Sequence, residues 1–564
     1  MIGDRATRAG GSRLPVMLLA VVMHLAASCT TGTTAASTTA APTTAAPTTT
    51  TGATSTTSGS VISTRPTTTA PAPATSPPAQ TTAAAAPVDP YSQPGWVAAE
   101  NMRPGSSEWR IAEQSSDHVS NLPQAWIEGY ASTAGAQHEQ VVTLFVDTPA
   151  DQFRVRAFRM GWYGGLQARL IWTSPPVPGG RQAPAEYDPG TGLAEAPWNP
   201  SLTFEVTSEW PPGAYLLRLE TDGGGAHFVP LTIRHDEAAG DLLLMSAVTT
   251  WQAYNPWGGC TLYTCFQPRR QQRATTVSFD RPYAHSYAQG AADFPTHELP
   301  LISFIEEQGL DVAYITSLDL HRDPRLATSR RALLSTGHDE YYSPPMRGAL
   351  VDALAAGTNL AFFGANAVYR NIRLEPGMGG APDRRMANHR STADPDAGDD
   401  PLGVTVNWRD APLNRPESEI VGLSYGCAGV RADMRLVNTS SWVFFGTGAA
   451  DGQQLDDLVG VEFDELPPAA ETPDNLEVLA ASPLRCHTAR YQQVTAYHTT
   501  ASGSGVFAAG TIDWSCGLDG SCSGIDRMEV VRGVTANVLR AFAAGPAGVE
   551  HPSTGNTAGF RPNP

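Results

Sequence analysis

The chain has 564 residues, of which 41% are hydrophobic and 16% charged, and its formal net charge is −18. This length and apolar content suffice for a sizeable core and for two folded domains. The negative balance argues against a nucleic-acid or anionic-membrane surface as partner, since both attract basic proteins. The 53 glycines and 46 prolines indicate many turns and short strands.

Residues 1–28 have the three-part form of a secretory signal peptide. Arg5, Arg8 and Arg13 precede an apolar run from Leu14 to Ala27, and small residues lead to Cys29. The segment from Leu25 to Cys29 is similar to bacterial lipoprotein cleavage sites, although its leucine stands one place early. We therefore expect an extracytoplasmic protein that is either secreted or anchored to the membrane only through a lipid at Cys29.

Residues 29–88 consist almost entirely of Thr, Ala, Pro, Ser and Gly. Such a composition cannot bury enough apolar surface to offset the entropy lost on ordering the backbone. The sequence therefore predicts a disordered stalk. A disordered tail is likewise expected at residues 547–564.

Seven cysteines are present, and without Cys29 an even number remains, as expected in an oxidising compartment. Several pairings are possible in principle. Closure of short loops favours Cys260 with Cys265 and Cys516 with Cys522, which leaves Cys427 for Cys486. A metal site or a thiol nucleophile is the alternative, but no Cys-x-x-Cys pair with zinc-ligand spacing occurs.

Residues 89–238 are predicted to form a β-sandwich of the immunoglobulin type. Short segments of β-type composition alternate with turn residues, and no helical period is present. The expected strands are 140–146, 153–159, 202–206, 213–219 and 228–233.

The pattern changes in residues 239–546, where apolar runs alternate with amphipathic segments. Strands are predicted at 242–248, 312–315, 332–334 and 360–363, and helices at 299–308 and 346–356. The pattern resumes at 442–446 and 505–510 and in a helix at 532–544, after an irregular insertion at 377–422. This alternation predicts βαβ units and a mainly parallel sheet.

Polar or aromatic clusters follow four of these runs. Because parallel strands end at the same edge of a sheet, and ligands bind at such edges, the clusters should converge. They are Thr249–Asn255, His338–Glu340, Gly364–Asn366 and Gly510–Ser515. The sequence contains no Gly-x-Ser-x-Gly elbow, Gly-rich phosphate loop or His-Glu-x-x-His helix, which weakens serine-hydrolase, nucleotide and ordinary zinc-protease chemistry. The remaining oxygen-rich set suits a hard cation such as ferric iron.

Several motifs, in one order, resemble the large-subunit family of N,N-dimethylformamidase. They include Glu100-Asn101, Phe158–Gly165, Thr250–Asn255, Val277–Tyr283, Gly337–Tyr341 and Phe362–Asn366. The resemblance implies an immunoglobulin-like β-sandwich followed by an α/β domain similar to class I glutamine amidotransferases. It also implies hydrolysis of a small amide-like substrate at one iron per chain, held by two tyrosines and one glutamate.

Carried onto this sequence, the resemblance makes Tyr215, Tyr254 and Glu340 the iron ligands. His338 and Asn366 correspond to active-site partners, and Glu462 to a general base. Each residue also has a structural reading: Tyr215 as a corner tyrosine bonded to backbone, Tyr254 as core packing, and Glu340 as a charge at a helix N-terminus. His338 can be a satisfied buried histidine, Asn366 a turn residue and Glu462 a surface carboxylate.

The alternative function is a non-catalytic surface module that binds glycan, peptide or envelope material. A glycosidase site is not supported, since no paired-carboxylate pattern identifies one. The companion subunit of the amidase is not encoded in this chain, an oligomer is possible, and shared fold does not establish a shared substrate.

Overall fold

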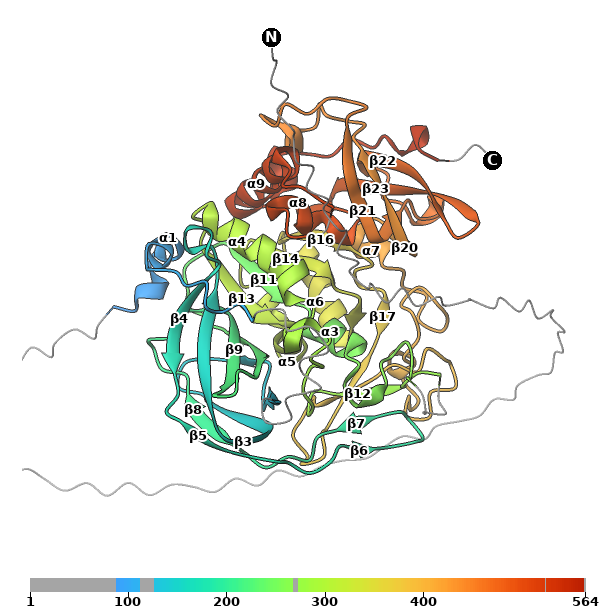
Figure 1. Cartoon of the computed structure of the whole chain (residues 1–564). Helices are drawn as coiled ribbons and strands as arrows, with labels where there is room; N and C mark the ends of the chain where they lie inside the picture. The colour runs from blue at the N-terminus through green and yellow to red at the C-terminus, as the bar shows by residue number, and fades with distance from the viewer. Residues whose placement is uncertain (1–87, 112–125, 267–271, 523, 562–564) are drawn as a thin grey trace, which may run out of the picture. The chain divides into compact units, whose positions relative to one another are not determined.

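The computed structural model describes residues 88–111, 126–266, 272–522 and 524–561 (Figure 1). The predicted signal peptide, Cys29 and most of the predicted stalk lie outside these residues. Val88–Pro564 forms one compact unit of mixed α/β structure in which strands predominate. Among the described helices, none has the length and apolar character needed to cross a membrane.

The first sheet is organised around one long strand, β3 (Val141–Met160). Its first half pairs with β1 (Glu128–Ala131) and β8 (Leu202–Glu205), and its second half with β4 (Ala168–Thr173) and β9 (Gly213–Thr221). Two separate strands were predicted here, and they are continuous because the polar middle of β3 pairs with β5 (Val177–Gly180). The sheet is completed by β10 (Ala226–Ile233), which pairs with β9 and with β2 (Gly135–Ala136).

The second sheet has seven strands in the order β13-β11-β14-β16-β24-β23-β22. The first five are parallel, which confirms the predicted mainly parallel sheet, and β23 and β22 add an antiparallel pair. The strands are β13 (Val312–Thr316), β11 (Leu242–Ser246), β14 (Ala332–His338), β16 (Asn359–Ala365), β24 (Gly505–Ala508), β23 (Ala489–Thr499) and β22 (Glu477–Cys486).

Helices cover both faces of this sheet, so its inner strands are apolar on both sides. Leu242 and Leu244 belong to one core cluster with residues of α4 (Leu299–Glu307) and α9 (Glu529–Ala544). Leu243 and Met245 point the other way and pack with α5 (Ser317–Arg322) and α6 (Pro344–Ala355). The first sheet joins this body through the fully buried ion pair of Arg159 on β3 with Glu306 on α4, at 2.6 Å.

Two segments differ from the sequence-based expectation. Trp442–Phe444 forms a short 3-10 helix, η9, in place of the predicted strand, and Asn537 of α9 donates to the carbonyls of Val443 and Phe445 at 2.9 and 2.8 Å. The described part of the predicted disordered tail is ordered and includes α10 (Ala547–Glu550) and η12 (Thr557–Gly559). Asn556 explains why, since its Oδ1 accepts a hydrogen bond from the Val478 backbone N–H of β22 at 2.7 Å.

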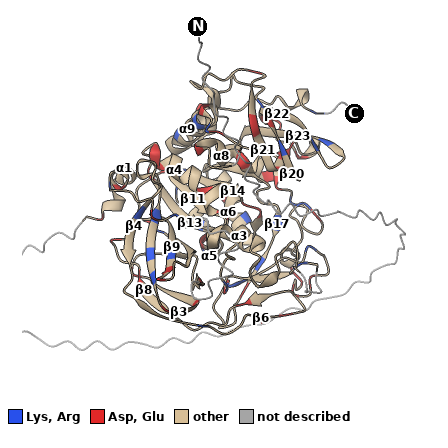
Figure 2. Cartoon of the chain, viewed as in Figure 1, with Lys and Arg blue, Asp and Glu red and all other residues tan. Residues whose placement is uncertain are grey.

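Three disulfides are present among the described residues, Cys260–Cys265, Cys427–Cys486 and Cys516–Cys522. Two of them close short loops as predicted, and the third joins the cysteines that remain. In the view of Figure 2, acidic and basic residues are interspersed along the elements.

Candidate metal centre

Three neighbouring parallel strands deliver polar side chains to one edge of the second sheet. β11 is followed by α3 (Val248–Tyr254), β14 ends at His338, and Asn366 follows β16. The ends of β14 and β16 lie very close, since a Cβ placed on Gly364 would be 1.7 Å from the carbonyl oxygen of Gly337. Contacts of Tyr254 with His338 and Glu340 confirm the predicted convergence for the clusters that follow β11 and β14.

Two tyrosines meet one carboxylate oxygen at this edge. The Tyr254 hydroxyl donates to Glu340 Oε2 at 3.0 Å, and the Tyr263 hydroxyl donates to the same oxygen at 2.5 Å. Their rings stack with centroids 4.4 Å apart. Burial is the main cause that raises the pKa of both phenols well above the ordinary value of tyrosine, and the charge of Glu340 is the second cause.

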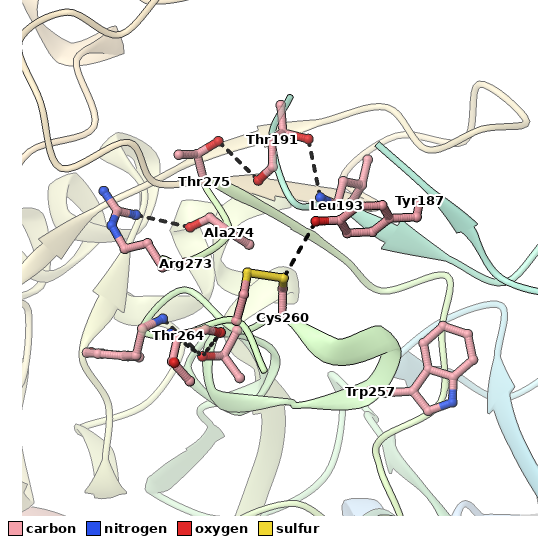
Figure 3. Close-up of a disulfide and its surroundings, with 12 residues drawn as sticks. Tyr187, Thr191, Leu193, Trp257, Cys260, Thr264, Arg273, Ala274 and Thr275 are labelled. Carbon is pink, nitrogen blue, oxygen red and sulfur yellow. Dashed lines mark hydrogen bonds between the residues drawn. A yellow bond between two sulfur atoms is a disulfide. The ribbon is translucent and has the colours of Figure 1, made fainter. Parts of the chain in front are cut away.

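Tyr263 belongs to a short loop that the Cys260–Cys265 disulfide closes. Figure 3 shows this disulfide and its surroundings. Within the loop, the Thr261 N–H donates to the Thr264 carbonyl at 2.8 Å. The Leu262 N–H donates to the carbonyl of Ala253 at 2.9 Å, so the residues that precede the two tyrosines are bonded to each other. The disulfide and this backbone bond together bring Tyr263 against Tyr254.

Glu340 is almost completely buried and bonded on both sides. Its Oε1 accepts from Arg370 Nε at 2.9 Å, and its backbone N–H donates to Thr250 Oγ1 at 3.0 Å. Burial alone would raise the pKa of this carboxyl, but the hydrogen bond with His338 and the charge of Arg370 hold it well below the ordinary value. Glu340 is therefore an anion in this pocket.

His338 lies between two carboxylates. Its Nε2 is 3.5 Å from Glu340 Oε2 and 3.6 Å from Glu462 Oε2. Burial disfavours the charged ring, yet the charge of Glu462 and the hydrogen bond with Glu340 raise its pKa to about 9. The imidazole is therefore a proton donor toward this pocket at neutral pH.

Asn366 links the edge of the sheet to a hairpin made of β20 (Ser424–Arg435) and β21 (Gln454–Glu465). Its Nδ2 donates to Glu462 Oε2 at 2.7 Å and its backbone N–H to Asp464 Oδ1 at 2.8 Å. The residue has a φ of +57°, which asparagine tolerates better than most residues. Burial raises the pKa of Glu462 and also that of Asp464, the latter to about 7.

Tyr215 does not join this centre. It lies on β9 in the core of the first sheet, is 1% exposed, and its hydroxyl donates to the Pro211 carbonyl at 2.7 Å. This is the corner-tyrosine geometry that the sequence left open as its structural reading. The second phenol beside Glu340 is Tyr263 instead.

The donor set of Tyr254, Tyr263 and Glu340 fits a small, hard cation. Adjacent ligands of an octahedral ion with bonds of about 2.0–2.1 Å are themselves about 2.9 Å apart, and the two phenol oxygens lie 3.0 and 2.5 Å from Glu340 Oε2. Phenolate and carboxylate oxygens prefer such cations. Because both phenols are buried, a positive ion among them is the natural means of ionising them.

Sequence reasoning missed Tyr263 and Arg370. Tyr263 stands between two cysteines expected to pair, and this constraint was the available signal for a fixed side chain. Arg370 begins the two-residue strand β17 (Arg370–Asn371), which no periodicity marks. Asp339, between His338 and Glu340, accepts hydrogen bonds from Ser335 and Tyr342 at 2.8 and 2.5 Å, which stabilise the turn.

The fold and site together define a mixed α/β protein with a buried tyrosine–carboxylate centre at the carboxyl edge of a largely parallel sheet. The family described as N,N-dimethylformamidase beta subunit-like, C-terminal, matches residues 154–527, and the chain belongs to it.

No curated protein matches the sequence. Among solved structures, a Paenibacillus sp. cycloisomaltooligosaccharide glucanotransferase complexed with cycloisomaltoheptaose is 9% identical, with a TM-score of 0.13. The match covers 34% of this chain and 27% of that chain. A similarity of this size carries no argument about fold or function.

Proposed function

We propose that this protein is an extracytoplasmic, iron-dependent hydrolase that cleaves the C–N bond of an amide. The observation that carries the proposal is the meeting of two phenols on one buried carboxylate oxygen, with a histidine and a second carboxylate beside them. Family membership agrees, since the family is named after an amidase. The finer fold proposed with it is an immunoglobulin-like sandwich followed by a class I glutamine amidotransferase-like domain.

Tyr254, Tyr263 and Glu340 would hold the ion, and Arg370 keeps Glu340 oriented through its Oε1. Bound ferric iron supplies Lewis-acid polarisation of the amide carbonyl. A metal-binding role for Tyr263 takes the place that the sequence resemblance gave to Tyr215.

The protein's own groups would manage the protons. Glu462 accepts the proton of the attacking water as general base, and the Asn366 side chain fixes its orientation. His338 faces the same space and donates a hydrogen bond to the oxyanion that develops on the carbonyl oxygen. The proton taken by Glu462 then passes to the departing amine.

The proposed location rests on the signal sequence and agrees with the three disulfides of the described chain. Acylation of Cys29 would make a lipid the membrane attachment. Mass spectrometry of the mature N-terminus tests this step, because an unmodified or absent Cys29 would leave a secreted protein.

Iron content and colour test the central proposal, because ferric tyrosinate absorbs visible light. We expect the purified mature chain, supplied with ferric iron, to retain one ion and to hydrolyse small formamides or acetamides. Glu340→Ala should lose the ion and the colour while its circular dichroism stays unchanged. A wild-type protein that remains colourless and iron-free would refute the proposal and favour the alternative, a non-catalytic binding module.

A further inference from the structure

Arg390 lies directly against the candidate metal centre. Its guanidinium carbon is 4.2 Å from the centroid of the Tyr263 ring, on the tyrosine whose hydroxyl bonds Glu340. Its Nη2 donates to the Tyr341 hydroxyl at 2.9 Å, and its Nε donates to Asn388 Oδ1 at 3.1 Å. None of these partners is a carboxylate.

The charge of Arg390 is not balanced by a salt bridge. Within the described chain, no carboxylate oxygen lies within 4.0 Å of its side-chain nitrogens, whereas four neighbouring arginines each have an acidic partner. Those neighbours are Arg370, Arg373, Arg384 and Arg385. The Arg390 side chain is half-buried in a protein with a net charge of −18. Arg370 adds positive charge near it, and Glu340 adds negative charge without forming a salt bridge with it.

The backbone under Arg390 is held in an unusual conformation. Its φ is +53°, which costs energy for a residue with a side chain. The guanidinium of Arg273 fixes the preceding turn by donating to the carbonyls of Asn388 and His389 at 3.1 and 2.5 Å, and the Arg390 N–H donates to the Thr405 carbonyl at 2.8 Å. The fold thus supports a strained residue whose cation faces the site.

We infer that the substrate of this centre is an amide that also carries a carboxylate, and that Arg390 binds this carboxylate. This inference rests on the proposed amide hydrolysis and adds the substrate class. One guanidinium balances one negative charge. The bonds to Asn388 and Tyr341 leave Nη1 and the second N–H of Nη2 of Arg390 to donate to the two oxygens of a carboxylate. Arg390 is therefore a specificity-determining residue beside the reacting group.

Two matched probes test the inference, N-formylglycine and N-formylglycinamide, which differ only in the carboxylate. Their dissociation constants are measured by calorimetry on the mature chain, both with and without iron. We expect the wild-type protein to bind N-formylglycine about 10- to 100-fold more tightly, the range of a charge-assisted hydrogen bond. The analogue with a phosphonate in place of the carboxylate should bind less tightly than N-formylglycine.

Arg390→Gln should remove this preference, and Arg390→Lys should retain part of it. Arg325→Gln is the matched control, because it changes the net charge equally at a side chain that is 88% exposed. Iron content is measured for each variant, so that a loss of the ion is not mistaken for a loss of carboxylate binding. Equal affinity of the wild type for both probes, including no measurable affinity for either, overturns the inference, as does a preference that survives Arg390→Gln.

Binding and turnover separate this inference from the proposed function. A carboxylate preference without amide hydrolysis or iron would refute the hydrolase and leave the anion site standing. Hydrolysis of neutral amides without any carboxylate preference would support the hydrolase and refute the carboxylate-binding role of Arg390.

Discussion

The Cys260–Cys265 disulfide offers the sharpest test of how the tyrosine centre is built. Replacing both cysteines by serine removes the covalent closure of the loop that carries Tyr263. The cysteines are 5 positions apart, and the chain-entropy relation for so short a loop gives about 2.2 kcal/mol, or roughly 40-fold in an equilibrium constant. This is an upper limit for the loss of iron affinity, because the bond from the Leu262 N–H to the Ala253 carbonyl continues to hold the loop.

The assay is a competition of the mature protein with an iron chelator, followed by visible absorption. The matched control is Cys516→Ser with Cys522→Ser, whose cysteines are 6 positions apart and which therefore loses nearly the same entropy term. Both double variants should show similar losses in the free energy of unfolding. We expect only the Cys260 and Cys265 variant to bind iron between several-fold and 40-fold more weakly. If the two variants retain the same iron affinity, the disulfide does not position Tyr263.

Three further predictions concern the fold and the site. Tyr215→Phe should lower the free energy of unfolding by about 1 kcal/mol, because the bond to Pro211 is lost, and should leave iron binding unchanged. Tyr263→Phe should abolish the visible band. Denaturant unfolding and absorption measure the two effects, and a loss of iron in Tyr215→Phe would contradict the assignment. Burial raises the pKa of Glu298 to about 8, so in this pH range the folded state holds a proton that the unfolded state has lost. The free energy of unfolding should therefore fall by up to about 1.4 kcal/mol per pH unit as pH rises from 4.5 toward 8. Glu298→Gln should remove that slope and be the more stable protein at pH 9, and an unchanged slope in urea titrations would refute this. Gly364→Ala should destabilise the protein strongly, because its Cβ would meet the Gly337 carbonyl. Gly348→Ala, in an open position of α6, should stabilise the protein by about 0.5–1 kcal/mol. Thermal unfolding of the two variants tests how closely β14 and β16 approach each other at the site.

The second sheet was accessible to sequence reasoning because its strands are buried on both faces. Leu242–Ser246 and the first three residues of β14, 332–334, form continuous apolar runs, and the helix at Leu299–Glu307 is rich in apolar residues. The β20–β21 hairpin was missed, since β20 is mostly half-exposed or exposed and shows no strong alternation. Its absence from the prediction left Glu462 without a structural reason to reach His338.

The sequence by itself determined the alternation of strands and helices and the family to which the chain belongs, and it favoured the three cysteine pairs without fixing them. It also placed Tyr254, His338, Glu340 and Asn366 at strand ends, because the carboxyl ends of parallel strands must meet. Only the tertiary structure decided between Tyr215 and Tyr263. Their roles differ because β9 turns Tyr215 into an apolar core, while a disulfide-closed loop folds Tyr263 back onto α3 and Glu340.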